Sequence, residues 1–155
     1  MPESTDVRVF RERPVSFVRR SGRMSEAQER AWAELSGHYV LPIPRGDVRP
    51  GAAIDPAREF GRHAPLVVEI GSGQGHAIVH AAASRPDTDF LAVEVFKAGL
   101  ARTMLDADRV GARNLRLAEA NAPEVLEHLL PAGSVDELWI FFPDPWHQKR
   151  HTKRR

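Results

Sequence analysis

Cysteine is missing from this chain of 155 residues, and long apolar segments are missing as well. The lack of cysteine excludes disulfides, thiolate metal sites and a cysteine nucleophile, and it fits a reducing compartment. No apolar run approaches the ~20 residues that a helix needs to cross a bilayer, and the N-terminus has no apolar segment of signal-peptide length. We therefore expect a soluble, cytoplasmic protein with no membrane association.

An excess of one charge sign is also missing, since 22 basic and 21 acidic residues leave a net charge of only +1. The cations are unevenly placed, however. They crowd the two ends of the chain, and the acids lie mostly between them. Partners must therefore be inferred from the distribution of charge, and both ends are candidates for contact with a polyanion. The N-terminal cluster consists of Arg8, Arg11, Arg13, Arg19, Arg20 and Arg23.

Length and a hydrophobic content of 42% allow one globular core, which we place in residues 63–155. Residues 1–62 are read as a basic N-terminal arm with one helix. That helix is predicted from Ser25 to about Leu35, because Ser25 can cap it and Gln28 stands at the capping-box position. From residue 36 to residue 63 prolines and glycines recur, which predicts a linker or a loosely packed arm.

Strand and helix patterns alternate from residue 66 onwards. Continuous apolar runs of this kind are typical of parallel strands that are covered on both faces. The sequence therefore predicts an α/β fold, one half of a doubly wound, Rossmann-like parallel sheet with about four strands. The strands are expected at residues 66–70, 90–95, 114–118 and 136–142, with helices from the glycine turn to residue 84, at 97–110 and at 123–130.

The first strand ends in a turn that contains Gly71, Gly73 and Gly75. Glycines at this place let the backbone approach a ligand and bring a helix N-terminus close to it. The dinucleotide fingerprint would require a further glycine where His76 stands, which disfavours a nicotinamide-dependent oxidoreductase. Glu69, inside the strand, could meet the cationic ammonium group of S-adenosylmethionine and would repel a pyrophosphate. A tight turn without a ligand is the alternative.

Two polar residues follow the next strands. Glu94 ends the second strand, about twenty residues after the glycine turn, at a position from which an acid accepts hydrogen bonds from both ribose hydroxyls. An ordinary solvated acid is the alternative reading of Glu94. Asn121 follows the third strand, where its amide could pair with the edge of an adenine or could cap the next helix.

The C-terminal segment places a carboxylate beside an aromatic ring and a basic run. Asp144 lies between two prolines just past the fourth strand, in a stiff loop at the carboxyl end of the sheet. Trp146 could stack on a base or cover the edge of the core. The following cations favour contact with phosphates over a merely solvated face. They include Lys149, Arg150, Lys153 and Arg154. The histidines show no metal-ligand spacing, so we expect no metal.

Together these segments resemble the bacterial tRNA (guanine-N7-)-methyltransferase family. The resemblance runs from about residue 13 to residue 155. The glycine turn is shared by many methyltransferases, whereas the Phe-Pro-Asp-Pro-Trp block with its basic run is highly specific. The similar segments are Ser16–Gln28, Glu69–Gly75, Phe90–Val95, Asn114–Arg116 and Phe141–Arg155.

The resemblance implies the fold of class I methyltransferases and methyl transfer from S-adenosylmethionine to N7 of a guanine in the variable loop of tRNA. The family's cofactor-binding pattern falls on Glu69, Glu94, Asn121 and Asp144, together with the three glycines of the turn. N7 carries a free lone pair, so positioning should dominate catalysis. Asp144 is then the candidate catalytic residue, because an acid near the base could stabilise developing positive charge.

Two departures from the family pattern affect these expectations. Gln148 stands where the family usually has a lysine, and the family continues for several dozen residues beyond position 155. We expect the fourth strand to lie at an edge of the sheet, with its apolar Trp139–Phe142 run unpaired on one side. The chain as given is therefore expected to be truncated or frameshifted, to bind cofactor poorly and to have little activity. A non-catalytic RNA-binding module of the same fold is the alternative.

Overall fold

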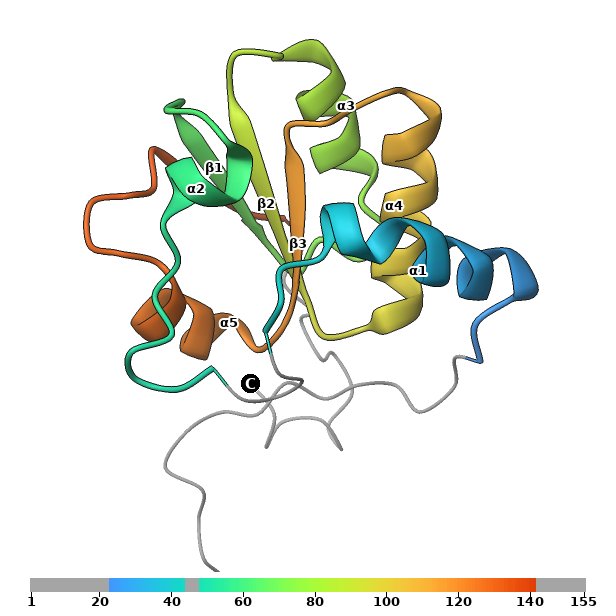
Figure 1. Cartoon of the computed structure of the whole chain (residues 1–155), viewed down its shortest axis with the longest axis horizontal. Coiled ribbons are helices and arrows are strands. Elements are labelled where there is room, and N and C mark those ends of the chain that lie inside the picture. Colours follow the sequence, from blue (N-terminus) through green and yellow to red (C-terminus); the bar gives the residue numbers. More distant parts are fainter. Residues whose placement is uncertain (1–22, 44–47, 142–155) are drawn as a thin grey trace, which may run out of the picture.

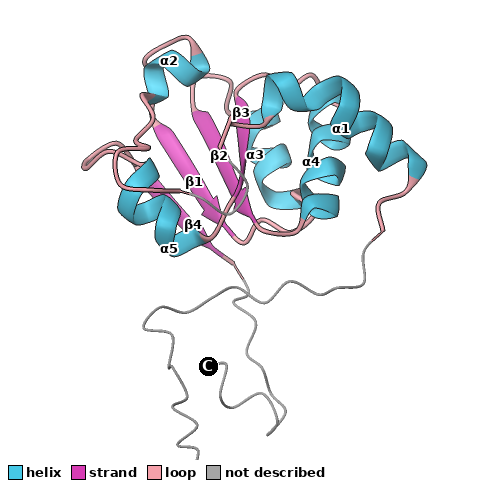
Figure 2. Ribbon diagram, turned by 60° about the horizontal axis from the view of Figure 1, so that its bottom comes forward, coloured by secondary structure: helices cyan, strands magenta, loops and turns pink. Residues whose placement is uncertain are grey.

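A sheet of four parallel strands lies between two layers of helices (Figure 1, Figure 2). The structure is a computed structural model that describes residues 23–43 and 48–141. The strands are β1 (Leu66–Ile70), β2 (Asp89–Glu94), β3 (Leu115–Glu119) and β4 (Glu137–Ile140). They are ordered β3-β2-β1-β4, and every neighbouring pair is parallel. The expected α/β fold with four parallel strands is confirmed.

The order of the strands reverses beside β1. The chain runs outward from β1 to β2 and β3, and it then returns to the other side of β1 to form β4. In open parallel sheets, ligands bind outside the carboxyl ends of the strands at such a reversal. The fold alone therefore directs attention to the ends of β1 and β4 and to the loops that follow β1, β2 and β3.

One face of the sheet is covered by α1 (Glu26–Tyr39), α3 (His76–Ser84) and α4 (Lys97–Arg109) (Figure 2). The predicted capping box is confirmed: the Gln28 amide donates to Ser25 Oγ, and the Ser25 amide donates to Gln28 Oε1. The helix α1 runs past its predicted end to Tyr39. This tyrosine is fully buried, and its hydroxyl donates to the carbonyl of Ala112 at 3.1 Å, so tertiary packing lengthens the helix.

The opposite face is covered by α5 (Ala122–Glu124), which continues as the π-helical turn η1 (Val125–Leu129), and by residues 48–60. The helix expected at 123–130 is therefore present, with a wider final turn in which the Leu130 amide donates to the carbonyl of Val125 at 3.1 Å. Val125 and Leu129 are both buried against the sheet. Within the described ranges, no helix is long and apolar enough to cross a membrane.

The segment that is rich in proline and glycine packs on the sheet more closely than its composition predicts. Leu41 and Val48 are buried, and the Leu41 amide donates to the carbonyl of Leu117 on β3 at 2.8 Å. A short helix that was not predicted, α2 (Pro56–Phe60), begins at the cap Asp55. Apolar residues between the prolines supply this packing. The boundary between residues 62 and 63 stays a prediction.

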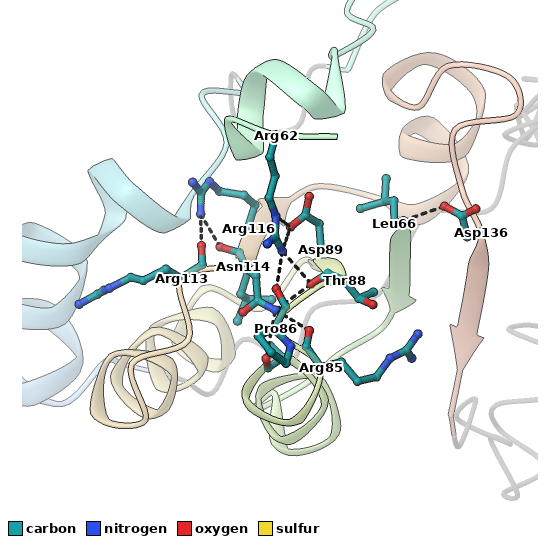
Figure 3. Close-up of polar contacts among 12 residues, drawn as sticks. Arg62, Leu66, Arg85, Pro86, Thr88, Asp89, Arg113, Asn114, Arg116 and Asp136 are labelled. Carbon is teal, nitrogen blue, oxygen red and sulfur yellow. Dashed lines mark hydrogen bonds and ion pairs between the residues drawn. The ribbon is translucent and has the colours of Figure 1, made fainter. Parts of the chain in front are cut away.

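Polar contacts hold the amino ends of the strands together (Figure 3). Arg62 donates to the buried carboxylate of Asp89 through Nε at 2.9 Å and through NH2 at 2.7 Å. Asn114 donates to the carbonyl of Ala82 in the last turn of α3 and to two carbonyls, of Arg85 and Thr88, in the loop between α3 and β2. On the other side, Asp136 accepts a hydrogen bond from the Leu66 amide at 2.7 Å. These contacts connect the amino ends of the strands to one another and to the segments that precede them.

Candidate functional site at the carboxyl end of the sheet

The turn between β1 and α3 is built from three glycines in the left-handed region. Gly71, Gly73 and Gly75 have φ values of 69°, 58° and 80°. Residues with a side chain rarely adopt these values, which explains the spacing in the sequence. The Gly71 amide donates to the carbonyl of Val93 at 2.8 Å, so the turn is attached to the end of β2.

Glu94 links the glycine turn to the start of α4. Its Oε2 accepts a hydrogen bond from the Gly73 amide at 2.8 Å. Its Oε1 accepts from the amides of Val95 at 2.8 Å and Phe96 at 3.0 Å. The structure therefore brings together the glycine turn and Glu94, which the sequence analysis singled out separately. A carboxylate has about four lone-pair positions, so these three bonds leave Glu94 able to accept one more.

Glu69 is the most unusual side chain of the site, because it is an acid with only 4% of its surface exposed. Its Oε2 has no hydrogen-bond partner among the described residues. Burial, and to a lesser extent the charge of Glu94, raise the pKa of Glu69 to about 7. Ser72, inside the glycine turn, also has a buried hydroxyl without a partner in the described part of the chain. Buried polar atoms normally have partners, so these two atoms are candidates for contact with a ligand or with water.

A pocket of about 80 Å³ lies beside the turn, at the ends of β1, β2 and β3. Asn121 stands between two of its lining residues, at the N-cap of α5, and its side chain makes no capping hydrogen bond. The helix-cap alternative for Asn121 is therefore not realised in this structure. The pocket is lined by Ile70, Gly71, Val93, Glu94, Val95, Ala120 and Ala122.

A larger cavity of about 400 Å³ lies at the opposite end of the sheet, where Arg62 and Asn114 contribute to its wall. Its polar groups are largely engaged in the contacts that hold the strands together. Ligands of open parallel sheets bind at the carboxyl ends of the strands, so this end of the sheet is the candidate site. It includes the smaller pocket, whose lining does not contain Glu69 or Ser72.

The remaining predicted site residues lie outside the described residues. They are Asp144, which is the candidate catalytic residue, and the candidate RNA-binding residues Lys149, Arg150, Lys153 and Arg154. Their roles stay predictions. Among the residues that the structure describes, no group of three or more histidine, aspartate or glutamate side chains is arranged to hold a metal ion.

Sequence reasoning missed two residues at this site. Ser72 was passed over although it lies between two glycines of the turn. Gly99 was passed over as well, inside a predicted helix, although an isolated glycine in a helix often has a packing reason. The signal for Ser72 is its place between two glycines, and the signal for Gly99 is a glycine inside a helix.

A family model described as "Putative methyltransferase" matches residues 63–155. The chain belongs to this methyltransferase family. The matched residues contain the whole sheet, the glycine turn and Glu94, which are the parts that build the candidate site.

Curated relatives carry the name tRNA (guanine-N(7)-)-methyltransferase. The relative from Paenarthrobacter aurescens is 54% identical over 92% of this chain and 49% of its own length. The relative from Bifidobacterium longum is 49% identical over 91% of this chain and 51% of its own length. The relative from Saccharophagus degradans is 46% identical over 90% of this chain and 58% of its own length. The chain thus spans about half the length of the curated relatives it matches, and the family resemblance noted in the sequence is confirmed.

Proposed function

We propose that this chain binds S-adenosylmethionine at the carboxyl end of its sheet and takes part in methyl transfer to N7 of a guanine in tRNA. The observation that carries the proposal is the buried carboxyl group of Glu69, two residues before the glycine turn, whose Oε2 has no hydrogen-bond partner in the part of the chain that the structure describes. Such a group is costly to bury without a cationic partner. The names of the relatives support the choice of reaction.

The residues present fit the chemistry of this cofactor. Glu69 would meet its cationic ammonium group, and Glu94 would use its remaining acceptor position for a ribose hydroxyl. Asn121 would face the edge of its adenine, since its side chain is not engaged as a helix cap. When bound, the cofactor supplies an electrophilic methyl group on a sulfonium. The glycines of the turn leave room for the backbone to approach it.

The reaction needs few catalytic groups. N7 of guanine has a free lone pair, so no proton must be removed before it attacks the methyl group, and orientation should account for most of the rate. Asp144 is proposed as the acid that orients the guanine or stabilises the cationic purine. The C-terminal cations would hold the tRNA in a salt-sensitive way, and the enzyme would work in the cytoplasm.

Titration of the ¹⁵N-labelled chain with S-adenosylmethionine tests the cofactor proposal. We expect saturable shifts of the amide resonances of residues 71–75 and 94–96, and none with NADH at the same concentration. The absence of shifts with S-adenosylmethionine would contradict the proposal. Binding of tRNA without binding of the cofactor would favour the RNA-binding module instead. The dissociation constant also measures whether the chain binds its cofactor as poorly as the sequence analysis predicts.

Transfer of a labelled methyl group to tRNA tests the reaction. We expect the label in 7-methylguanine of the variable loop, and we expect the Asp144→Ala variant to lose this transfer while it still binds tRNA. Normal turnover by the variant would show that Asp144 is not catalytic. Label in another nucleoside would contradict the proposed substrate atom.

A further inference from the structure

Gly99, inside α4, has no role in the proposals above, yet it lies directly against the glycine turn. We propose that Gly99 is a positioning residue, which lets α4 approach so closely that the helix holds the backbone of the turn in place. The link to cofactor affinity rests on the proposed function. The structural part of the inference, that α4 positions the turn, does not.

The first observation is steric. A Cβ atom added to Gly99 would collide with the carbonyl oxygen of Gly73 and would lie 3.1 Å from its carbonyl carbon. These are backbone atoms in the middle of the turn, so they cannot rotate away as a side chain could. Any side chain at position 99 must therefore displace either α4 or the turn.

The second observation is another contact between α4 and the turn, in which the glycine belongs to the turn and its neighbour to the helix. A Cβ atom on Gly75 would collide with the side chain of Thr103, whose Cβ would lie 2.8 Å away. Thr103 is fully buried one turn after Gly99, and its hydroxyl donates to the Gly99 carbonyl at 2.9 Å. Its rotamer is thus held by the helix itself. Two glycines, one on the helix and one in the turn, allow the close approach of α4.

The third observation concerns Gly73, which is held from two sides. Its carbonyl packs against Gly99, and its amide donates to Glu94 Oε2 at 2.8 Å. Glu94 also accepts from the amides of Val95 and Phe96, which lead into α4. The turn, the end of β2 and the start of α4 therefore form one unit. A displacement at Gly99 should weaken the bond between Gly73 and Glu94.

The difference in helix propensity between alanine and glycine makes the Gly99→Ala substitution a specific test. Alanine favours the interior of a helix more than glycine does, so the Gly99→Ala substitution should stabilise α4 if the helix were considered alone. A loss caused by this substitution must then come from the contact with the turn. Gly37 offers a matched control, because it lies inside α1 and a Cβ atom there would meet no atom of the described residues within 4 Å.

The experiment compares the full chain with its Gly99→Ala and Gly37→Ala variants by amide NMR, by circular dichroism and by titration with S-adenosylmethionine. In Gly99→Ala we expect a changed Gly73 amide resonance and a dissociation constant raised at least about tenfold, with the far-ultraviolet spectrum unchanged. Gly37→Ala should leave both quantities unchanged. An unchanged Gly73 resonance, or an unchanged dissociation constant, in a folded Gly99→Ala variant overturns the inference.

Two outcomes of this experiment require a separate interpretation. If the unmodified chain binds no S-adenosylmethionine, the proposed function fails, and the Gly73 resonance alone decides the inference about Gly99. If Gly99→Ala does not fold, Thr103→Ala takes its place, since it removes atoms and creates no collision. That variant should change the Gly75 resonance and weaken cofactor binding, whereas an unchanged Gly75 resonance overturns the inference.

Discussion

At the scale of single residues, Glu69 is an acid that stabilises the fold best when it is neutral. It lies in the central strand β1, between Ala92 and Trp139 of the neighbouring strands, and only 4% of it is exposed. Burial disfavours its charged form, and the carboxylate of Glu94 adds repulsion. The same property makes it a strong partner for a cationic ligand once it is ionised.

The raised pKa of Glu69 predicts a pH dependence of stability. Because its folded-state pKa of about 7 lies above the ordinary 4.5, the folded chain binds this proton more tightly than the unfolded chain. The stabilisation is fully present below the unfolded pKa and is lost as the pH rises through the folded one. We expect urea unfolding to show a free energy of unfolding that falls by up to about 3 kcal/mol between about pH 5 and 8.

Glu69→Gln tests whether this carboxyl group causes the pH dependence. The variant should lack most of the pH dependence, and it should bind S-adenosylmethionine more weakly at pH values where the wild-type residue is ionised. A variant whose stability falls with pH as steeply as that of the original chain would show that another group is responsible.

Glu94 supports a second prediction at the residue scale. A glutamine at this position removes the charge and replaces one acceptor oxygen by a donor, so the three amide hydrogen bonds cannot all persist. We expect Glu94→Gln to lower the free energy of unfolding by about 1–3 kcal/mol and to weaken cofactor binding by about tenfold or more. Glu34→Gln, at an exposed position of α1, is the matched control. Equal behaviour of the two variants would contradict the role of Glu94.

At the scale of elements, the residues before the sheet are part of its structure. Arg62 lies just before β1 and neutralises Asp89, which is 3% exposed at the start of β2. Asn114, the residue just before β3, donates hydrogen bonds to the end of α3 and to the loop that leads into β2. Residues from three segments of the chain therefore meet at one end of the sheet (Figure 3).

We expect two arginine substitutions to lower the free energy of unfolding by different amounts, because one ion pair has a buried carboxylate and the other is exposed. Arg62→Ala leaves the buried carboxylate of Asp89 without its partner, and we expect a loss of about 1–3 kcal/mol in thermal or urea unfolding, reduced from the value of a fully buried pair by the partial exposure of Arg62. Arg109→Ala removes an exposed ion pair with Asp106 and should cost well under 1 kcal/mol, or about nothing. Similar losses in both variants would refute the distinction.

At the scale of the whole molecule, β4 is an apolar edge strand of the described sheet. Within the described residues it pairs with β1 alone, and its far edge has no neighbouring strand. Leu138, Ile140 and Phe141 are 47%, 55% and 45% exposed. The sequence analysis expected this strand at an edge, and the order of the strands confirms it. Unpaired apolar edges promote association of chains.

We therefore expect the double variant Leu138→Lys, Ile140→Lys to reduce self-association, measured by sedimentation at matched concentrations. Its melting temperature should change little, because both side chains are already about half exposed. Val110→Lys, which alters an apolar residue of similar exposure at the end of α4, should leave self-association unchanged. Equal self-association of the double variant and the original chain would contradict this role for β4.

Much of this architecture was predictable, because it depends on local patterns. Continuous apolar runs indicated parallel strands covered on both faces, Ser25 and Gln28 indicated the start of α1, and the three glycines indicated a turn from the first strand into the next helix. The end of α1 at Tyr39 was not predictable. It depends on a hydrogen bond to Ala112, which is more than seventy residues away in the sequence.

The sequence by itself determined the α/β class, which depends on the periodicity of apolar residues, and the residue types at the end of the sheet. It also indicated the family, through the resemblance of its motifs. Only the tertiary structure decided that Glu69 is buried with an oxygen that has no partner among the described residues, that Glu94 accepts from the Gly73 amide, and that Gly99 packs against Gly73. Burial and close contact arise between distant segments, so they exist only once the helices have packed on the sheet.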